Sequence, residues 1–453
     1  MKLNPFGDRE FLGTMLRLAA PLALQQLAWA SLGAVDVLMI GQLGETALAG
    51  VALANQVFFL LSLLVFGIGT GAAVFGAQFW GRRDLPHVRK ILGLALVLGL
   101  AGSSIFTCLA VFAPHYVLGI YSQDPQVISV GGDYLRIVGL SYVVTTITLT
   151  YSYVLRSTGD VKTPMLVSLV ALVLKTGLGY LLIFGHLGLP TMGTDGAAIA
   201  TAVARYAECG VLLVVVYGRR LPVAARLREL FGWSRALVKG FVITALPVIV
   251  SEMGWAFGVT TYNAIYAHIG TDAIAAVNIA ATIEGIIFVF LASLANACAV
   301  MVGNQIGAGQ EEKASEYAYR YLVIGPVTAV VLGISVMLAS AWILSFYNIT
   351  AGTFSSARYT LIVLGALFWT KGVNMMTIVG ILRGGGDTRY ALAAEMISVW
   401  LVGVPLALFG AFVLHLPVQW VVLMALCEEV IKVFITVARV LSGRWVHNVV
   451  AHI

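Results

Sequence analysis

Charged residues are scarce in this sequence: Asp, Glu, Lys and Arg make up 11% of its 453 residues, whereas a soluble globular domain carries about 25%. Cysteine is scarcer still. Cys108, Cys209, Cys298 and Cys427 each lie in an apolar run and are expected to be small buried hydrophobes, not a disulfide framework or a zinc site. The sequence also lacks the Gly-rich lysine motif of P-loop ATPases and the HExxH motif of zinc proteases. With no other catalytic cluster, the chain is not predicted to be an enzyme.

Long apolar runs dominate what is present. Hydrophobic residues make up 60% of the chain and the mean hydropathy is +0.95. The runs are long enough for helices that cross a membrane, which need roughly 20 residues, and they lack the alternating ten-residue pattern of outer-membrane barrels. The sequence therefore predicts an all-α polytopic membrane protein with twelve spans, whose cores are 15–40, 47–78, 91–113, 130–155, 163–185, 195–217, 239–267, 273–305, 321–346, 359–382, 391–413 and 418–440.

Basic residues lie on one side of the predicted spans. They gather in the loops that follow the even-numbered spans, among them Arg82, Arg83, Arg156, Lys162, Arg219, Arg220, Arg383 and Arg389. The opposite side carries little more than Arg136 and Arg358. The positive-inside rule then places both termini in the cytoplasm, in the inner (plasma) membrane. Because the basic residues are explained by orientation, the net charge of +6 does not indicate a nucleic-acid partner.

The two halves of the chain repeat. Pro21 corresponds to Pro247, and the similar stretches that begin at Leu43 and Ile269 keep the same spacing. LRSTGDVK from Leu155 returns as LRGGGDTR from Leu382, at a spacing that is longer by one residue. Six-span repeats are typical of secondary transporters, whose binding sites lie near the membrane midplane. We predict an N-terminal lobe over residues 1–217, a cytoplasmic connector over 218–238 and a C-terminal lobe over 239–453. The connector is either a short amphipathic helix on the membrane surface or an extended basic linker.

Charged residues inside the spans are the best indication of a functional site, because a charge at the centre of the bilayer costs about 2.5–3.5 kcal/mol on insertion scales. These residues are Asp36, Lys175, Arg205, Glu208, Glu252, Glu284, Lys371, Glu395, Glu428, Glu429 and Lys432. Helical spacing pairs Arg205 with Glu208 and Glu428 with Lys432, and these pairs fit a structural role as well as a functional one. Glu395, eight residues past Asp387, is expected near the membrane surface.

Asp36, Glu252 and Glu284 have no obvious partner on their own helix. Buried carboxylates of this kind can carry a proton or bind a cation, which is the chemistry of a cation-coupled carrier. Aromatic residues and methionines recur in the second half, and such surfaces suit flat, apolar, often cationic ligands, although helix packing explains most of them. The candidate substrate-binding residues are Glu252, Trp255, Tyr262, Glu284, Phe288, Trp369, Lys371 and Met375.

Together these motifs resemble the multidrug and toxic compound extrusion (MATE) family, prokaryotic type. The resemblance covers essentially the whole chain and rests on Pro21 and Asp36, on LGETALAGVALANQ, GTGAAVFGAQFWGRRD, LRSTGD, GTDGAAIAT, ANACAVMVGNQIGAG and ILRGGGDTR, and on the ending EEVIKVFITVARVLSGRW. It implies two pseudo-symmetric six-helix lobes around a central cleft. It also implies export of organic, often cationic compounds in exchange for protons or sodium by alternating access.

The resemblance carries the family's acidic positions on the first and seventh spans over to Asp36 and Glu252, and the eighth span offers Glu284. With Lys175, which departs from the family pattern, these residues form the predicted cation-coupling set. Many members of the family have an asparagine and an aspartate on the fifth span, where this chain has Lys175 and Gly179. A sodium site at Asp36 is therefore not carried over, and we expect Lys175 to pair with Asp36 in a salt bridge that a proton can switch. No metal site and no cofactor beyond the coupling H+ or Na+ is predicted.

The predicted partners are small organic substrates and the lipid bilayer, with a monomer as the functional form. The alternative function is a lipid-linked oligosaccharide flippase of the same superfamily, which usually has more spans and a more basic cavity. A membrane-embedded transferase is a third possibility, but the tandem repeat and the lack of a catalytic cluster disfavour it.

Overall fold

The computed structural model describes residues 8–451, which form helices and no strands. Ten of these helices are long and apolar enough to cross a membrane, and α5 (Pro125–Gly139) and α6 (Tyr142–Ser157), bent by 52°, form one more candidate span. The predicted twelfth span forms α16 (Val418–Ala425) and α17 (Cys427–Leu441). The predicted fold class, an all-α polytopic membrane protein, is confirmed. Residues 1–7 and 452–453 of the predicted lobes lie outside the described residues.

The described chain forms two compact units. The first unit comprises residues 24–241. The second unit comprises residues 8–23 and 242–451. Two helices have residues in both units. The first turns of α1 (Arg9–Gly41) belong to the second unit and the rest to the first, whereas α10 (Arg235–Ile269) begins in the first unit and continues in the second. The connector between the repeats belongs to the first unit.

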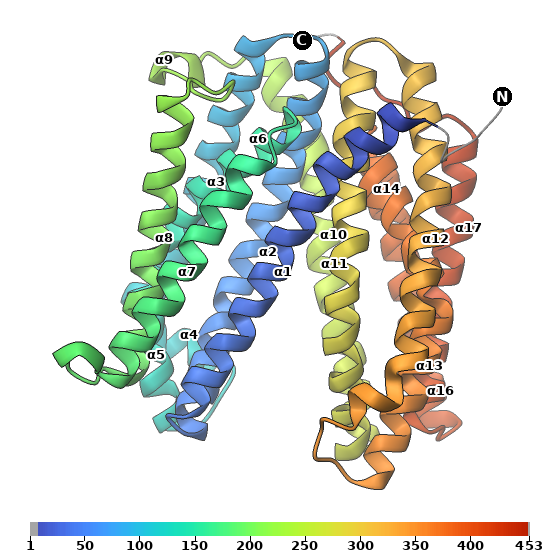
Figure 1. Ribbon diagram of the computed structural model, residues 1–453. Helices are drawn as coiled ribbons and strands as arrows, with labels where there is room; N and C mark the ends of the chain where they lie inside the picture. The colour runs from blue at the N-terminus through green and yellow to red at the C-terminus, as the bar shows by residue number, and fades with distance from the viewer. Residues whose placement is uncertain (1–7, 452–453) are drawn as a thin grey trace. The chain divides into compact units, whose positions relative to one another are not determined.

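In the first unit, α2 (Glu45–Gly81) is the central helix and packs against α3, α5 and α6 (Figure 1). The other helices are α3 (Leu85–Phe112), α4 (Pro114–Gly119), α7 (Lys162–Phe184) and α8 (Gly193–Gly218). Val51, Leu61 and Leu135 lie in the core of this unit. Gly50 and Gly131 let α2 and α5 approach closely, since a Cβ on Gly131 would lie 2.7 Å from the Gly50 carbonyl oxygen. Small residues at such contacts are typical of membrane helices.

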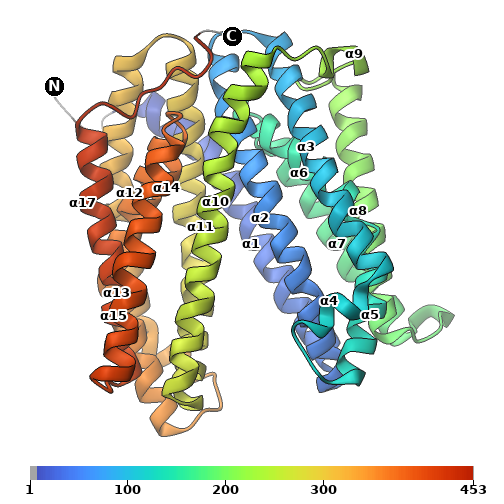
Figure 2. The same ribbon diagram turned by 180° about the vertical axis from the view of Figure 1, so that it is seen from behind.

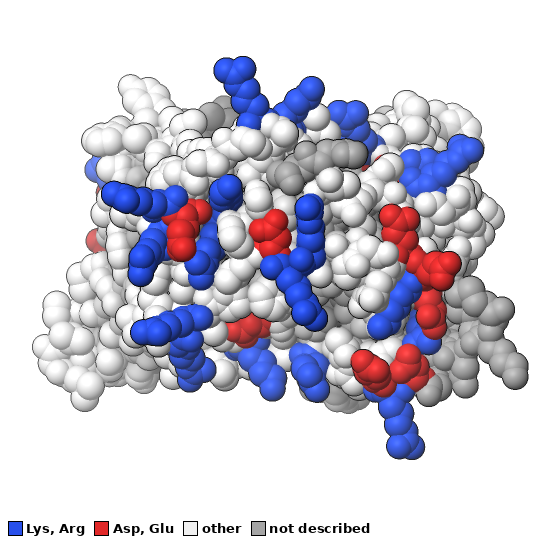
Figure 3. Space-filling view, turned by 90° about the horizontal axis from the view of Figure 1, so that it is seen from above, with Lys and Arg blue, Asp and Glu red and all other residues white. Residues whose placement is uncertain are grey.

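The connector folds against the N-terminal end of α3 and includes one short helix. Its helix α9 is short, Leu227–Leu230, and its Leu230 is buried. The Trp233 indole donates to the Lys90 carbonyl at 3.0 Å, and Arg89 pairs with Glu229 at 2.9 Å. The Arg226 backbone N–H and the Arg89 guanidinium hold the pKa of Glu229 below its ordinary value. Basic side chains are spread over the end face seen from above (Figure 3), as the positive-inside pattern predicts.

The second unit is built from long helices and from segments with a wider, π-helical turn (Figure 2). They are α10 (Arg235–Ile269), α11 (Thr271–Gly307), α12 (Glu311–Leu344), α13 (Ala351–Asn374), η2 (Met375–Arg383), α14 (Thr388–Ser398), η3 (Val399–Gly403), α15 (Val404–Leu408), η4 (Phe409–Val413), α16 and α17. α12 and α13 meet at glycines, because a Cβ on Gly372 would lie 3.1 Å from the Gly325 carbonyl oxygen. The segments η2, η3 and η4 are π-helical, a form that occurs frequently at functional sites.

Both ends of the described chain pack into the second unit. Phe11 contacts Tyr317 and Tyr321 with ring centroids 5.1 and 5.4 Å apart. After α17, Trp445 is fully buried, and the His447 backbone N–H donates to the Gly385 carbonyl at 2.9 Å. Burial opposes ionisation of Asp387 in this loop, but hydrogen bonds from His447 and Arg439 outweigh it and hold the pKa of Asp387 below its ordinary value.

The four cysteines are free. Cys209 and Cys298 are buried, as predicted for small hydrophobes. Cys108 is exposed and Cys427 is only partly buried, so the prediction was wrong for Cys108. An apolar run indicates a span, but it does not tell which face of the helix packs against protein.

Candidate functional site

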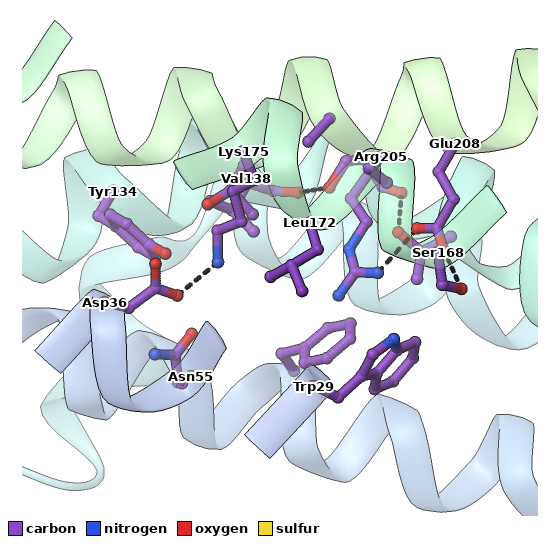
Figure 4. Close-up of a pocket in the computed structure, with 17 residues that line it drawn as sticks. Trp29, Asp36, Asn55, Tyr134, Val138, Ser168, Leu172, Lys175, Arg205 and Glu208 are labelled. Atoms are coloured by element: carbon purple, nitrogen blue, oxygen red, sulfur yellow. Dashed lines mark hydrogen bonds and ion pairs between the residues drawn. The ribbon is translucent and has the colours of Figure 1, made fainter. Parts of the chain in front are cut away.

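The first unit contains a cavity of about 190 Å³ that is lined by charged, polar and apolar side chains (Figure 4). Six helices line it: α1, α2, α5, α6, α7 and α8. We call it the N-terminal cavity. Its charged and aromatic lining residues are Trp29, Asp36, Phe58, Tyr134, Lys175, Arg205 and Glu208.

Asp36 and Lys175 meet at one end of the N-terminal cavity. Asp36 reaches from α1 and Lys175 from α7, and the Lys175 ammonium donates directly to Asp36 Oδ2 (Figure 4). The Lys175 side chain is 13% exposed and the Asp36 side chain 32%. The two lone charges that the sequence places on different spans are therefore brought together as an ion pair. Asn55 lies beside Asp36 and adds an amide to this end of the cavity.

The other end of the N-terminal cavity holds a second ion pair that continues as a chain of hydrogen bonds. Arg205 donates to Glu208 Oε2 at 3.0 Å, as the helical spacing predicts, and its guanidinium lies 5.2 Å from the Trp29 ring centroid. The Ser168 hydroxyl donates to Glu208 Oε1 at 2.8 Å. Gln25 Nε2 donates to Ser168 Oγ at 2.8 Å. The Glu208 carboxylate is thus bonded from α7 and from its own helix.

Arg156 completes this chain. Its Nη2 donates to Gln25 Oε1 at 2.8 Å, so Gln25 both accepts and donates. The sequence analysis placed Arg156 among the loop charges and did not single out Gln25 or Ser168. Counted with Arg156, the N-terminal cavity and its hydrogen-bonded chain hold three cations and two carboxylates.

The second unit holds a larger group of charges, which we call the C-terminal carboxylate network. Its members are Glu252, Glu284, Glu395, Glu428, Glu429, Lys371, Arg383 and Lys432. They come from α10, α11, α13, η2, α14 and α17. In these ion pairs of the described residues, five carboxylates share three cations.

Lys432 is the buried centre of the α17 part of this network. Its Nζ lies 3.8 Å from Glu428 Oε1 and 3.5 Å from Glu429 Oε1, which confirms the spacing-based pairing with Glu428. Tyr262 donates to Glu428 Oε2 at 2.5 Å, and Asn374 Nδ2 donates to Glu429 Oε2 at 2.6 Å. Each glutamate therefore has one lysine contact and one neutral donor.

The two remaining parts of the network lie on other helices. Lys371 donates directly to Glu284 Oε1 and is also within electrostatic range of Glu429 and Glu428. Arg383 donates from Nη1 to Glu252 Oε1 at 2.7 Å, and its Nη2 lies 3.5 Å from Glu395 Oε2. Glu395, which the sequence analysis expected near the membrane surface, is buried in the protein at 9% exposure, against Ser251 and Arg383. Arg383, which the sequence analysis placed in a loop, is 2% exposed.

The aromatic candidates are less concentrated than the charged ones. Tyr262 lies in the C-terminal carboxylate network, whereas Trp255 and Trp369 are exposed on α10 and α13. Phe288 and Met375 pack against a small apolar core around Phe368. Of the eight candidates, Glu284 and Lys371 contact each other, Glu252 contacts Arg383 and Tyr262 contacts Glu428, whereas the other four take no part in these ion pairs and hydrogen bonds.

Gly403 has no side chain, and the Tyr262–Glu428 contact occupies the space beside its Cα. A Cβ at Gly403 would lie 2.5 Å from Glu428 Oε2 and closer still to the Tyr262 hydroxyl. We expect Gly403→Ala to separate this pair and to cost about 1–3 kcal/mol, the usual range for overpacking, measured as a lower midpoint of thermal unfolding in detergent. Gly285→Ala, which has open space around its Cβ position, is the control. Equal unfolding midpoints for the two variants would contradict the steric argument.

These features define a class of protein: a multi-pass α-helical membrane protein built as a repeat, with charged side chains inside its helical units. The chain matches the MatE family over residues 21–181 and 247–409, and it belongs to that family of transporters. Among curated relatives, the "Probable multidrug resistance protein NorM" of Rhizobium meliloti is 31% identical over 399 residues, covering 86% of this chain and 84% of the relative. The "Multidrug resistance protein PmpM" of Pseudomonas aeruginosa is 27% identical over 408 residues, covering 88% and 83%.

Solved structures share the fold. One, described as a MATE transporter in the straight conformation, aligns with a TM-score of 0.86 at 20% identity and covers 95% of both chains. Another, described as the outward-facing conformation of a multidrug resistance MATE family transporter, aligns with the same TM-score at 19% identity and covers 95% of this chain and 96% of its own. The predicted family membership is confirmed.

Proposed function

We propose that this protein is a secondary active antiporter that exports organic, cationic and amphipathic compounds in exchange for protons or sodium by alternating access. Membership of the MatE family and the names of the multidrug resistance relatives support export of drug-like compounds. The same comparisons favour this function over a lipid-linked oligosaccharide flippase. We place the protein in the plasma membrane as a functional monomer with both termini in the cytoplasm.

The observation that carries the proposal is the excess of two carboxylates over cations in the C-terminal carboxylate network. Charges removed from water are tolerated when they are paired, and an ionised carboxylate without a cation takes up a proton or binds another cation. The network therefore has room for positive charge from outside the chain. A cationic substrate and a coupling cation can compete for it, which is what an exchange mechanism requires.

Asp36 and Lys175 differ from the C-terminal carboxylate network, because this pair has no excess of negative charge. Their charges already balance in the N-terminal cavity, so the pair needs no further cation. A proton on Asp36 would remove the charge that holds Lys175 and would weaken the link between α1 and α7. We therefore assign Glu252 and Glu284 to cation binding, and Asp36 and Lys175 to a proton-sensitive link.

Substrate-dependent ion flux in proteoliposomes tests the proposal. We expect an imposed pH or sodium gradient to drive dye export by the wild-type protein. Glu252→Gln removes one acceptor of positive charge, and a loss of about 1.4 kcal/mol of coupling energy would lower the coupled flux about tenfold. Glu316→Gln is the matched control, because Glu316 also pairs with an arginine, Arg320. Lipid scrambling without dye export, or Glu252→Gln flux equal to wild type, would contradict the proposal.

A further inference from the structure

The two halves of the chain carry the same arginine-centred contact at corresponding positions. At the repeat spacing of Pro21 and Pro247, Gln25 corresponds to Ser251. At the spacing of Leu155 and Leu382, Arg156 corresponds to Arg383, and Ser168 corresponds to Glu395. In the first unit, Arg156 Nη2 donates to Gln25 at 2.8 Å and Gln25 donates to Ser168 at 2.8 Å. In the second unit, Arg383 Nη2 donates to Ser251 Oγ at 3.3 Å and Ser251 donates to Glu395. The Arg156 contact thus links α1 to α7, and the Arg383 contact links α10 to α14.

The chemistry of the two contacts differs in one respect. Around Arg156 the matched partners are an amide and a hydroxyl, and the residue after Gln25 is Gln26. Around Arg383 two carboxylates replace neutral groups: Glu395 stands where the first half has Ser168, and Glu252 where it has Gln26. One guanidinium therefore faces two carboxylates, and this group holds one net negative charge.

We propose that Glu395 is a proton-coupling residue of the C-terminal half and that Glu395 and Glu252 share one exchangeable proton around Arg383. The proton bonds to a carboxylate oxygen of either residue, which brings the net charge of the group from minus one to zero, and it leaves to water when the group ionises again. The proposal rests on the proposed antiport function. It adds a residue outside the cation-coupling set that the sequence predicts.

The contacts explain why this proton would matter for movement. With both glutamates ionised, Arg383 holds α10 through Glu252 and Ser251, and it holds α14 through Glu395. A proton on one glutamate replaces a charged acceptor by a neutral one, and hydrogen bonds to charged groups are roughly twice as strong as neutral ones. Protonation therefore loosens α10 from α14, whereas Arg156 donates to the neutral amide of Gln25 and reaches the Glu208 carboxylate only through Gln25 and Ser168.

The other charged residues around Glu395 form ion pairs with other residues. On α17, Lys432 lies within electrostatic range of Glu395 but is shared with Glu428 and Glu429. Before α14, Asp387 is held by Arg439 at 2.7 Å and faces His447 at 3.6 Å. Lys371 pairs with Glu284. Among the described residues, Arg383 is thus the cation that forms ion pairs with both Glu252 and Glu395.

The pH profile of dye export and of substrate-induced proton release, measured on purified full-length protein, tests the proposal. Glu395→Gln leaves Glu252 with Arg383 and without a neighbouring negative charge, so Glu252 takes up its proton less readily. We expect the midpoint of the profile to move about one pH unit toward acid. Glu395→Asp should restore part of the wild-type profile, and Glu316→Gln should leave it unchanged. A Glu395→Gln midpoint equal to that of wild type would overturn the proposal.

The repeat supplies a second variant that keeps the fold. The double substitution Ser251→Gln with Glu395→Ser gives the C-terminal contact the residues of the N-terminal one, which the first unit accommodates. We expect this variant to unfold at a midpoint close to that of wild type and to show the same acid shift of the pH profile. A folded double variant with a wild-type pH profile would overturn the role of Glu395.

The outcomes separate this proposal from the proposed function. If no ion gradient drives export by the wild-type protein, the antiport function fails and this inference fails with it. If export is driven by sodium alone, the antiport function stands and the shared proton is overturned. If protons drive export and Glu252→Gln alters the pH profile but Glu395→Gln does not, the function stands and only the role of Glu395 is overturned.

Discussion

Lys432→Met is expected to lower the midpoint of thermal unfolding more than any other single substitution in the C-terminal carboxylate network. The Lys432 side chain is 4% exposed and faces both Glu428 and Glu429. Its removal leaves two neighbouring carboxylates without their cation, and breaking a buried ion pair by removing one partner costs about 3–5 kcal/mol. Fluorescence-monitored unfolding of the purified protein in detergent measures the effect.

Two further variants make the Lys432 result specific. Lys432→Arg keeps the charge and should lose much less stability. The triple variant Glu428→Gln, Glu429→Gln, Lys432→Met removes all three charges and should regain part of what Lys432→Met loses, since the unpaired charges are then gone. Equal midpoints for Lys432→Met and wild type would mean that the two glutamates are neutral in the folded protein.

The second large effect is expected at the Asp36–Lys175 pair. Asp36→Asn leaves Lys175 as an unbalanced cation in the N-terminal cavity, and Lys175→Met leaves Asp36 as an unbalanced anion. Each single substitution should lower proton-driven dye export at least about tenfold, the change that corresponds to about 1.4 kcal/mol. The measurement is the initial rate of export from proteoliposomes under an imposed pH gradient.

A double-mutant cycle separates the pair from the individual side chains. Residues in direct contact show interaction energies of about 0.5–3 kcal/mol, so the Asp36→Asn, Lys175→Met double variant should be more stable than the sum of the single changes predicts. Its export should nevertheless stay low, because the proton-sensitive link is absent. Additive changes in stability, or full export by the double variant, would contradict the assigned role.

The features that depend on local sequence were predictable. Apolar runs and basic loops located the spans, and helical spacing located the Arg205–Glu208 and Glu428–Lys432 pairs. The contact between Asp36 and Lys175 was also predicted, because two isolated charges in one half of a membrane protein have few other partners. In each case one property of the sequence, either periodicity or the high cost of a buried charge, determines the outcome.

Hydropathy and helical spacing did not predict the features that depend on which helices pack together. Glu395 pairs with Arg383, which precedes it on the far side of a loop, and with Ser251, which lies on the first helix of the second half. Gln25 carries no charge, so nothing in its hydropathy distinguishes it from other polar residues on a helix. The repeat spacing was the signal that could have found these residues, since Gln25 and Ser251 occupy corresponding positions.

The π-helical segment η2 bears on how the two halves diverged. The spacing between corresponding residues is the same at Pro21 and Leu43 but is longer by one residue at Leu155, so the stretch from Ile269 to Leu382 is one residue longer than the stretch from Leu43 to Leu155. A π-helical turn accommodates one extra residue within a helix, and η2 ends at Arg383. In a regular α-helix, one extra residue would rotate every later side chain by about 100°. The wider π-helical turn accommodates the residue without this rotation. Arg156 and Arg383 thus both contact the first helix of their own half, although the second half is longer by one residue before Arg383.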